Sequence, residues 1–235
     1  MNRRLFLASL GTGLGSAVLT ACDSQGPRSA LAILRRAERR NESLERWLFS
    51  NASRDRIPAD ARLAGPAFPS YFVSKRVPVW DPAMRGVWRL EVAGAVRRQL
   101  SLSLDDLVAM RGVSQRVNHY CVEGWNARAE FRGVRLSALA ALAGLTSDAA
   151  FVDFQSFDAD YHESWDLESA MHPQTIVAYA RDGQYLGAMQ GAPARIHSPV
   201  KLGYKNTKYL TRIVFLPQRT GGYWSDRGYE WYGGT

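Results

Sequence analysis

The stretch that most constrains this chain is residues 116–135, RVNHYCVEGWNARAEFRGVR, which holds one of the protein's two cysteines. Apolar residues alternate up to Cys121, then Val-Glu-Gly-Trp follows, and a basic segment comes next that is predicted to turn at Gly133. The pattern favours a strand that enters a glycine-containing loop. Because loops held by a scaffold commonly carry functional side chains, Cys121 is a candidate site residue. The alternative interpretation is that Cys121 has no function and only packs as a small buried hydrophobic residue.

The other cysteine, Cys22, follows a segment with the features of an export signal. Residues 1–21 begin with Arg3 and Arg4 and continue as an apolar run that is too short to span a membrane. The arginine pair resembles a twin-arginine signal, and residues 19–22, LTAC, resemble a bacterial lipobox in which Cys22 becomes lipidated. This resemblance implies a periplasmic protein that is exported already folded and anchored by lipid to the inner membrane.

The remaining chain is expected to contain two parts. Residues 22–57 are predicted to form a linker and an amphipathic helix, interpreted either as a spacer or as a surface for a membrane or redox partner. Residues 58–235 are expected to form one domain, whose hydrophobic content needs no disulfide. The formal net charge of +8 suggests an anionic partner, but the basic residues are scattered, which argues against nucleic acid.

Within the domain, short elements of both kinds are predicted. Strands are expected at residues 87–96, 151–157, 176–180 and 209–216, and helices at residues 103–110, 137–142 and 166–171. Residues 190–195 are predicted to be a loop, and residues 221–235 an aromatic, glycine-rich tail. The fold class is therefore α+β, with mixed β-sheets and short helices.

Several chemistries are excluded by their missing motifs. The chain has no nucleophile elbow, phosphate loop or C-x-x-C pair, and its four histidines lack zinc-type spacing. The histidines are interpreted as satisfied polar groups. What remains is Cys121 and a set of basic residues downstream. A thiolate suits sulfur-loving metals, whereas arginine and lysine suit phosphate. An organic cofactor that brings its own metal and ends in a phosphate would use both.

Three motifs carry a resemblance to a known family. Cys121-Val-Glu-x-Trp, then Gln190-Gly-Ala-Pro-x-Arg195 and Gly203-Tyr-Lys-x-x-Lys208, resemble the sulfite oxidase superfamily of molybdopterin oxidoreductases. The branch they resemble most is the catalytic subunit of periplasmic protein-methionine-sulfoxide reductase. The resemblance covers about residues 69–216 and implies a sulfite-oxidase-type fold.

The resemblance also implies roles for individual residues. Cys121 would be the protein sulfur on molybdenum, and Lys205 would act with it in catalysis. The cofactor would be molybdenum-molybdopterin in its mononucleotide form, with its phosphate on Arg195 and Lys208. The residues implied to bind this cofactor are Phe72, Val73, Ser74, Ser156, Gln190, Arg195, Lys205, Asn206, Thr207 and Lys208.

Departures from the family pattern shape the functional expectation. Ser74, Lys75 and Arg76 replace the arginine and histidine of true sulfite oxidases, and Gln190 replaces an asparagine of the sulfoxide-reducing branch. A C-terminal dimerisation domain is expected to be absent, which predicts a monomer. The implied function is oxygen-atom transfer at sulfur, most simply reduction of free or protein-bound methionine sulfoxide. Electrons would come from a membrane haem protein or a c-type cytochrome, since the chain has no haem, flavin or iron–sulfur motif.

Three alternatives stay open at this point. The first is oxidation of sulfite by the same cofactor. The second is a non-catalytic lipoprotein that works as a binding module, in which Cys121 is merely buried. The third is a thiol enzyme, in which Cys121 reacts directly with alkylating reagents.

Overall fold

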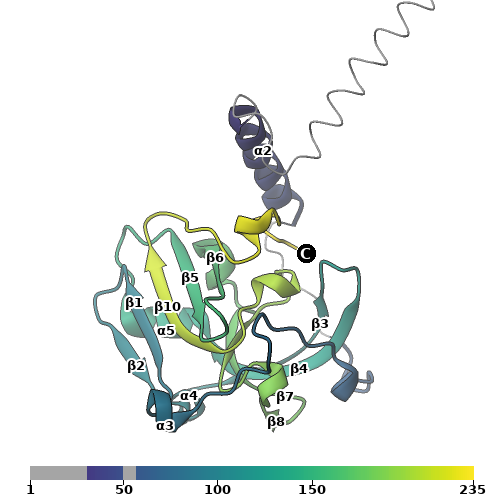
Figure 1. Ribbon diagram of the computed structural model, residues 1–235, viewed down its shortest axis with the longest axis vertical. Helices are drawn as coiled ribbons and strands as arrows, with labels where there is room; N and C mark the ends of the chain where they lie inside the picture. The colour runs from purple at the N-terminus through teal and green to yellow at the C-terminus, as the bar shows by residue number, and fades with distance from the viewer. Residues whose placement is uncertain (1–30, 50–56) are drawn as a thin grey trace, which may run out of the picture. The chain divides into compact units, whose positions relative to one another are not determined.

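The computed structural model describes residues 31–49 and 57–235 (Figure 1). The chain divides into two compact units, Met1–Trp47 and Leu48–Thr235. The expected signal over residues 1–21 and the lipidated Cys22 lie outside the described residues, and the boundary expected at residue 58 stays a prediction. Helix α2 (Leu31–Phe49) confirms the helix predicted before the domain. No helix of the described chain is both long and apolar enough to cross a membrane.

The first sheet of the domain contains five strands in the order β2-β1-β10-β5-β6 (Figure 1). They are β1 (Leu90–Gly94), β2 (Leu100–Leu102), β5 (Phe151–Ser156), β6 (His162–Asp166) and β10 (Leu210–Leu216). Strands β1 and β10 pair in parallel, and the other pairs are antiparallel. The predicted mixed sheet is therefore confirmed.

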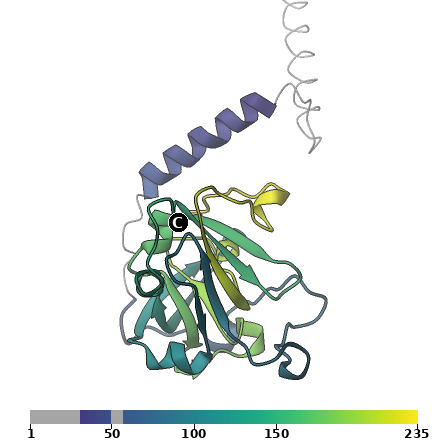
Figure 2. The ribbon, with the colours of Figure 1, turned by 90° about the vertical axis from the view of Figure 1, so that its left-hand side faces the viewer.

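The second sheet follows the order β3-β4-β7-β8 (Figure 1), and β9 pairs with β7. Figure 2 shows the same ribbon turned by 90° about the vertical axis. Its strands are β3 (Val113–Tyr120), β4 (Asn126–Arg135), β7 (Ile176–Arg181), β8 (Gln184–Tyr185) and β9 (Arg195–His197). The turn predicted at residues 181–183 is confirmed. Asp182 and Gly183 both have positive φ, which suits the tight two-residue turn of a hairpin.

The helices are short, as the sequence predicts. Helix α4 (Leu104–Ala109) begins with the capping box of Ser103 and Asp106. Helix α5 (Leu136–Ala143) ends before Gly144, and α6 (Leu167–Met171) is capped by Asp166. The remaining helical turns are α3 (Pro82–Arg85), η2 (Gly65–Ala67), η3 (Ala188–Gln190), η4 (Gly203–Lys205) and η5 (Ser225–Arg227). The α+β class is confirmed.

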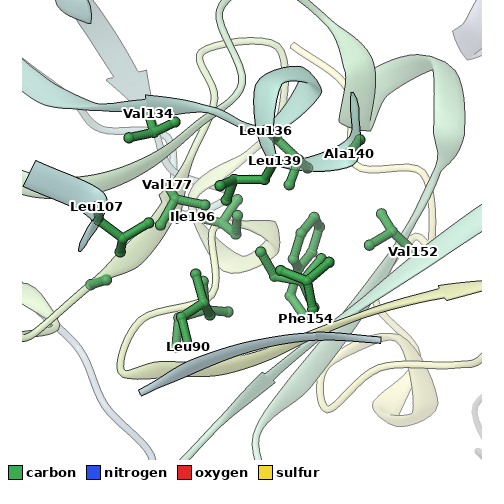
Figure 3. Packing of buried hydrophobic residues seen from close by; sticks show 14 of the residues in the cluster. Leu90, Leu107, Val134, Leu136, Leu139, Ala140, Val152, Phe154, Val177 and Ile196 are labelled. Atoms are coloured by element: carbon green, nitrogen blue, oxygen red, sulfur yellow. The ribbon is translucent and has the colours of Figure 1, made fainter. Parts of the chain in front are cut away.

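The main hydrophobic core lies between the two sheets (Figure 3). Leu90 and Phe154 come from the first sheet, whereas Val134 and Val177 come from the second. A second cluster covers the other face of β4 and β7 and contains Phe68, Ala127, Ala129, Phe131, Ile176 and Ala178. All six residues of β7 are buried. From Ile176 to Tyr179 successive side chains enter the second cluster and the main core alternately. The central strands thus form a rigid support for the loops at their ends.

The predicted turn at Gly133 is wrong. Residues 126–135 form one continuous strand, in which Gly133 pairs with Val113 of β3 and Ala178 of β7. A Cβ atom at this position would overlap the carbonyl oxygen of Val177. Glycine is therefore needed because two backbones approach closely, and not because the chain reverses there.

Strand β6 was not predicted because its sequence, HESWD, is mostly polar. The structure buries four of its five residues, among them Glu163 and Ser164 at 0% exposure. These polar groups are tolerated because other buried groups bond to them. Glu163 accepts from Lys205, and Ser164 accepts from the indole N–H of Trp231 at 2.9 Å.

Candidate functional site

A cavity of about 440 Å³ opens where the loops of both sheets meet. It is bounded by the segment before β1, the turn between β3 and β4, the loop after β5, the start of β9, and the residues around η4 and η5. The lining residues are Phe68, Pro69, Ser70, Tyr71, Phe72, Val73, His119, Cys121, Val122, Glu123, Trp125, Ser156, Asp158, Tyr161, Arg195, Gly203, Tyr204, Asn206, Lys208, Tyr209, Tyr223, Trp224 and Tyr229.

Cys121 lies directly after β3, in the turn that leads to β4. Its backbone N–H donates to the Trp125 carbonyl at 2.9 Å, and Gly124 N–H donates to the Cys121 carbonyl at 3.1 Å. These bonds hold the backbone of the turn that carries the thiol, which is partly buried and lines the cavity. The predicted junction of a strand with a glycine loop is confirmed.

The electrostatic surroundings of Cys121 do not activate it as a nucleophile. Burial is the main cause that raises the pKa of the thiol, and the charge of the Glu123 carboxylate raises it further, whereas the backbone N–H groups of Glu123 and Val122 lower it only in part. Reactive cysteines instead lie beside cations that lower their pKa. This environment argues against the thiol enzyme, whereas a soft metal would remove the proton on binding.

Two cationic side chains, Arg195 and Lys208, line the same cavity, and neither forms an ion pair with a carboxylate of the described chain. Arg195 is 5% exposed, and its guanidinium donates to the carbonyls of Gln190, Ile196 and Asn206 at 3.2–3.3 Å. Lys208 donates to the Met189 carbonyl at 3.2 Å. Neither forms an ion pair with any residue that the structure describes.

This pair of unneutralised cations is energetically costly. Burial lowers the pKa of Arg195 to about 10, and the charge of Arg181 lowers it further. Burial also lowers the pKa of Lys208 to about 7, where the charge of Arg195 adds to the decrease and the carboxylate of Asp158 only partly opposes it. Buried cations without a counter-charge are unfavourable in a folded protein. An anion bound in the cavity would relieve this cost, and a terminal phosphate fits the donor set.

The residues present therefore fit the expected cofactor. One soft sulfur and two phosphate-suited cations line a single cavity. Buried polar atoms that have no hydrogen-bond partner among the described residues lie around it, including His119 Nδ1 and the hydroxyl of Tyr209. Over the described ranges, no group of three or more His, Cys, Asp or Glu side chains could hold a metal ion.

The segment at residues 72–74 is held beside the cavity by Asp158. The carboxylate of Asp158 accepts from Val73 N–H at 2.7 Å and from Ser74 N–H at 2.8 Å. Asp158 N–H in turn donates to the Ser156 hydroxyl at 2.9 Å. Phe72, Val73 and Ser156 line the cavity, as expected, whereas Ser74 lies just outside the lining and directs its hydroxyl to Asp158.

The other predicted residues divide between the lining and its support. Asn206 lines the cavity, and its side chain accepts from Ser198 N–H at 2.6 Å. Gln190 lies outside the lining, and its side-chain oxygen accepts from Gly187 N–H at 3.1 Å. Thr207 also lies outside, with a buried hydroxyl that has no partner in the described chain.

Lys205 does not line the cavity. Its side chain is 0% exposed, and its ammonium lies 2.6 Å from the Glu163 carboxylate, which is also 0% exposed. Asn206, Arg195, Lys208 and Cys121 thus share one space, while Lys205 points into the protein behind it. A direct catalytic role for Lys205 stays a prediction, and the buried ion pair favours a supporting role.

The interpretation of all four histidines as satisfied groups is wrong for two of them. His119 Nδ1 is buried without a partner in the described chain. The same holds for both ring nitrogens of His197, and its ring stacks on Phe131 at 3.7 Å between centroids. Burial lowers the pKa of His197 well below its ordinary value, and lowers that of His119 to about 3. Both rings are therefore neutral near pH 7. His162, by contrast, bonds to Asp153 at 2.8 Å.

Sequence reasoning missed one wall of the cavity. Tyr223, Trp224 and Tyr229 come from the predicted aromatic tail, and Tyr161 comes from the loop before β6. The tail's aromatic composition was visible, but nothing local shows which surface it covers. Asp158 was also missed, because a single aspartate after a strand resembles an ordinary turn residue.

Comparison with known proteins agrees with this geometry. The family model described as "Oxidoreductase molybdopterin binding domain" matches residues 75–224. A protein of Azospira oryzae, named as the protein-methionine-sulfoxide reductase subunit YedZ1, is 37% identical over 234 residues. That match covers 99% of this chain and 88% of the relative.

More distant relatives share about half of their length with this chain. The protein-methionine-sulfoxide reductase catalytic subunits MsrP of Campylobacter jejuni and Xanthomonas campestris are 28% and 31% identical over 163 residues. Each match covers 62% of this chain and 54% or 50% of the relative. The crystal structure of the sulfane dehydrogenase SoxCD from Paracoccus pantotrophus aligns with a TM-score of 0.53 at 23% identity, over 56% of this chain and 38% of that one. This last likeness concerns the fold alone.

Proposed function

The chain belongs to the family of oxidoreductase molybdopterin-binding domains, within the sulfite oxidase superfamily, and from this membership we propose that it reduces sulfoxides. It is an oxidoreductase that uses a molybdenum-molybdopterin cofactor. The proposed substrate is methionine sulfoxide, free or within a protein. The reaction balances as R₂SO + 2 e⁻ + 2 H⁺ → R₂S + H₂O, with the electrons supplied by a haem protein.

One observation carries this proposal: Cys121, Arg195 and Lys208 line the same cavity. The names of the relatives from Azospira, Campylobacter and Xanthomonas support methionine sulfoxide as the substrate. The aromatic, largely uncharged side of the cavity also suits a neutral sulfoxide better than the sulfite dianion.

In this proposal the residues of the site have defined tasks. The cofactor, when bound, supplies the two-electron redox chemistry. Cys121 contributes the protein sulfur to its metal, and Arg195 and Lys208 bind its phosphate. Asp158 holds the backbone of residues 73 and 74, and the Cys121–Trp125 turn holds the backbone that carries the thiol. A mononucleotide form is proposed because one terminal phosphate is enough to neutralise this pair of cations.

The first experiment compares wild-type protein with Cys121→Ser after expression in a host that makes molybdopterin. We expect near-stoichiometric molybdenum in the wild type, and a thiolate-to-metal absorption band that Cys121→Ser lacks. Reduction of methionine sulfoxide should fall by more than about 100-fold, since loss of outer-shell partners alone costs 10–100-fold. Ser147→Ala, at an exposed turn position outside the cavity lining, serves as the control and should match wild type.

Other outcomes separate the alternatives. Folded wild-type protein without molybdenum would support the binding module and overturn the proposal. A protein that oxidises sulfite and leaves sulfoxides unchanged would favour the runner-up chemistry. Release of GMP or CMP when the extracted cofactor is hydrolysed would contradict the mononucleotide form.

We also propose that the protein is a periplasmic, lipid-anchored monomer whose electron donor is a membrane haem protein or a c-type cytochrome. The arginine pair and the lipobox in the sequence support this placement. The test is membrane fractionation of wild type and Cys22→Ala. The wild type should sediment with membranes, and the variant should be released into the soluble periplasmic fraction.

A further inference from the structure

Residues 221–235, here called the aromatic segment, form one side of the cavity. Tyr223, Trp224 and Tyr229 all line it. Tyr223 stacks on Tyr161 with 5.5 Å between ring centroids, and Trp224 contacts Tyr229 at 5.0 Å. The ring of Tyr229 also contacts that of Tyr204, with 5.4 Å between centroids. These rings make a continuous aromatic wall, on a different part of the chain from the cations that suit a phosphate.

The middle of the aromatic segment is held by a buried carboxylate. Glu163 Oε1 accepts from Trp224 N–H at 3.0 Å, and Oε2 accepts from the Ser225 hydroxyl at 3.3 Å. Oε2 also lies 2.6 Å from the Lys205 ammonium, and both side chains are 0% exposed. A buried charge that loses its partner is strongly unfavourable, so this pair fixes the Glu163 carboxylate in one place.

The aromatic segment is also pressed directly onto this carboxylate. The backbones of Gly222 and Glu163 form an antiparallel β-bridge. A Cβ atom at Gly222 would overlap the Glu163 carboxylate oxygens. Only glycine allows the backbone to approach so closely. The bond to Trp224 N–H therefore sets the position of the backbone that carries Tyr223 and Trp224.

The far end of the segment has separate anchors. Leu202 N–H donates to the Gly233 carbonyl at 2.9 Å, and the backbones of Lys201 and Gly234 form an antiparallel β-bridge. Trp231 is 5% exposed and donates to the Ser164 hydroxyl at 2.9 Å. The middle keeps one bond that is independent of the Glu163 side chain, from Tyr223 N–H to the His162 carbonyl at 2.8 Å. Loss of the Glu163–Lys205 pair would therefore loosen residues 224 and 225 first and leave the end of the segment attached.

We propose that Glu163 and Lys205 are positioning residues, whose buried ion pair holds the aromatic segment as a cavity wall against which the apolar substituent of a sulfoxide substrate packs. This inference rests on the proposed function for its substrate. Aromatic rings pack favourably against apolar groups and against sulfur. The wall thereby selects sulfoxides with an extended apolar or aryl flank over small ones.

The positioning role is tested by limited proteolysis with trypsin, which needs no cofactor. Arg219 and Arg227 flank the Glu163 contact and are exposed. In Glu163→Gln, cleavage after these residues should become at least about 10-fold faster than in wild type. Glu91→Gln, which removes one side of the exposed Glu91–Arg212 ion pair, is the matched control and should cleave like wild type.

A double variant separates local release from general unfolding. Glu163→Met with Lys205→Met replaces the buried ions by apolar groups of similar size, a change that often preserves stability. It still removes the acceptor of Trp224 N–H. Fast cleavage in a double variant that unfolds at the wild-type urea concentration would support the proposal. Wild-type cleavage rates in both the single and the double variant would overturn it.

The substrate contact is tested with two sulfoxides of different size. Trp224→Ala should raise KM for methyl p-tolyl sulfoxide about 3- to 10-fold and change kcat and the KM for dimethyl sulfoxide less than about 2-fold. Tyr185→Ala, an exposed aromatic residue on β8, is the control. Equal changes for both sulfoxides would overturn the contact. A wild type that reduces neither sulfoxide would overturn the proposed function and the contact with it, while the proteolysis still decides the positioning role.

Discussion

The backbone N–H of Ser74 donates to the carboxylate of Asp158 at 2.8 Å, which joins two residues 84 positions apart in the sequence. The same carboxylate accepts from Val73 N–H at 2.7 Å. One side chain thus holds the segment that contributes Phe72 and Val73 to the cavity. This bond connects the extended chain before β1 with the loop after β5.

We predict that Asp158→Asn weakens retention of the cofactor by about 10- to 100-fold. An amide oxygen accepts more weakly than a carboxylate, and hydrogen bonds to charged groups are worth about 1.5–3 kcal/mol. The measurement is molybdenum content after dialysis, on equal amounts of folded protein. Asp160→Asn, the same exchange at an exposed position two residues away, should match wild type. Equal molybdenum in all three proteins would contradict the prediction.

Arg195→Ala and Lys208→Ala should each lower cofactor retention by about 10- to 100-fold, because each removes a charge-assisted bond to the phosphate. Added salt should weaken retention further in these variants than in wild type, since one cation alone is screened more easily. Lys75→Ala, which removes an exposed cation, is the control. Retention that is unchanged in the Arg195 and Lys208 variants would place the phosphate elsewhere.

The cofactor-free protein should become more stable as pH rises from about 7 to 10. Burial lowers the pKa of Lys208 from 10.5 to about 7, so in this window the unfolded chain binds a proton that the folded chain has lost. Stability then increases with pH, by an amount on the order of 1–3 kcal/mol after allowance for solvent screening.

Urea unfolding at several pH values measures this increase. Lys208→Met removes the titrating group and should flatten the rise between pH 7 and 10. A wild type and a Lys208→Met variant with parallel pH profiles would show that Lys208 keeps an ordinary pKa. Binding of the phosphate-bearing cofactor should also flatten the wild-type profile, because an anion favours the charged lysine.

Gly133→Ala should destabilise the domain by about 1–3 kcal/mol, the usual cost of forcing an extra group into a packed interior. The added Cβ would overlap the Val177 carbonyl oxygen and push β4 away from β7. Gly187→Ala, which meets open space at an extended backbone position, should be nearly neutral. The measurement is the urea midpoint of unfolding for both variants. Equal midpoints would mean that the strands separate without cost.

Local features of the fold were predictable because their causes are local. Ser103 and Asp106 cap α4 with side chains three residues apart, and Gly144 ends α5 through its own backbone freedom. The turn predicted at Gly133 was wrong because a glycine can allow either a turn or a close approach of two backbones. Only the position of the neighbouring strand decides between them. Strand β6 was missed because its polar residues are buried by partners that are distant in sequence, such as Lys205 for Glu163.

The sequence by itself determined which residues can do chemistry: a single thiol at the end of a strand, and cations at Arg195 and Lys208 that suit a phosphate. Tertiary structure decided which of these share a space. Arg195 and Lys208 meet Cys121 at one cavity, whereas Lys205 turns inward to Glu163. The aromatic segment becomes a wall only because β6 buries a carboxylate beneath it. Such contacts depend on the packing of whole sheets, and no short window of sequence encodes them.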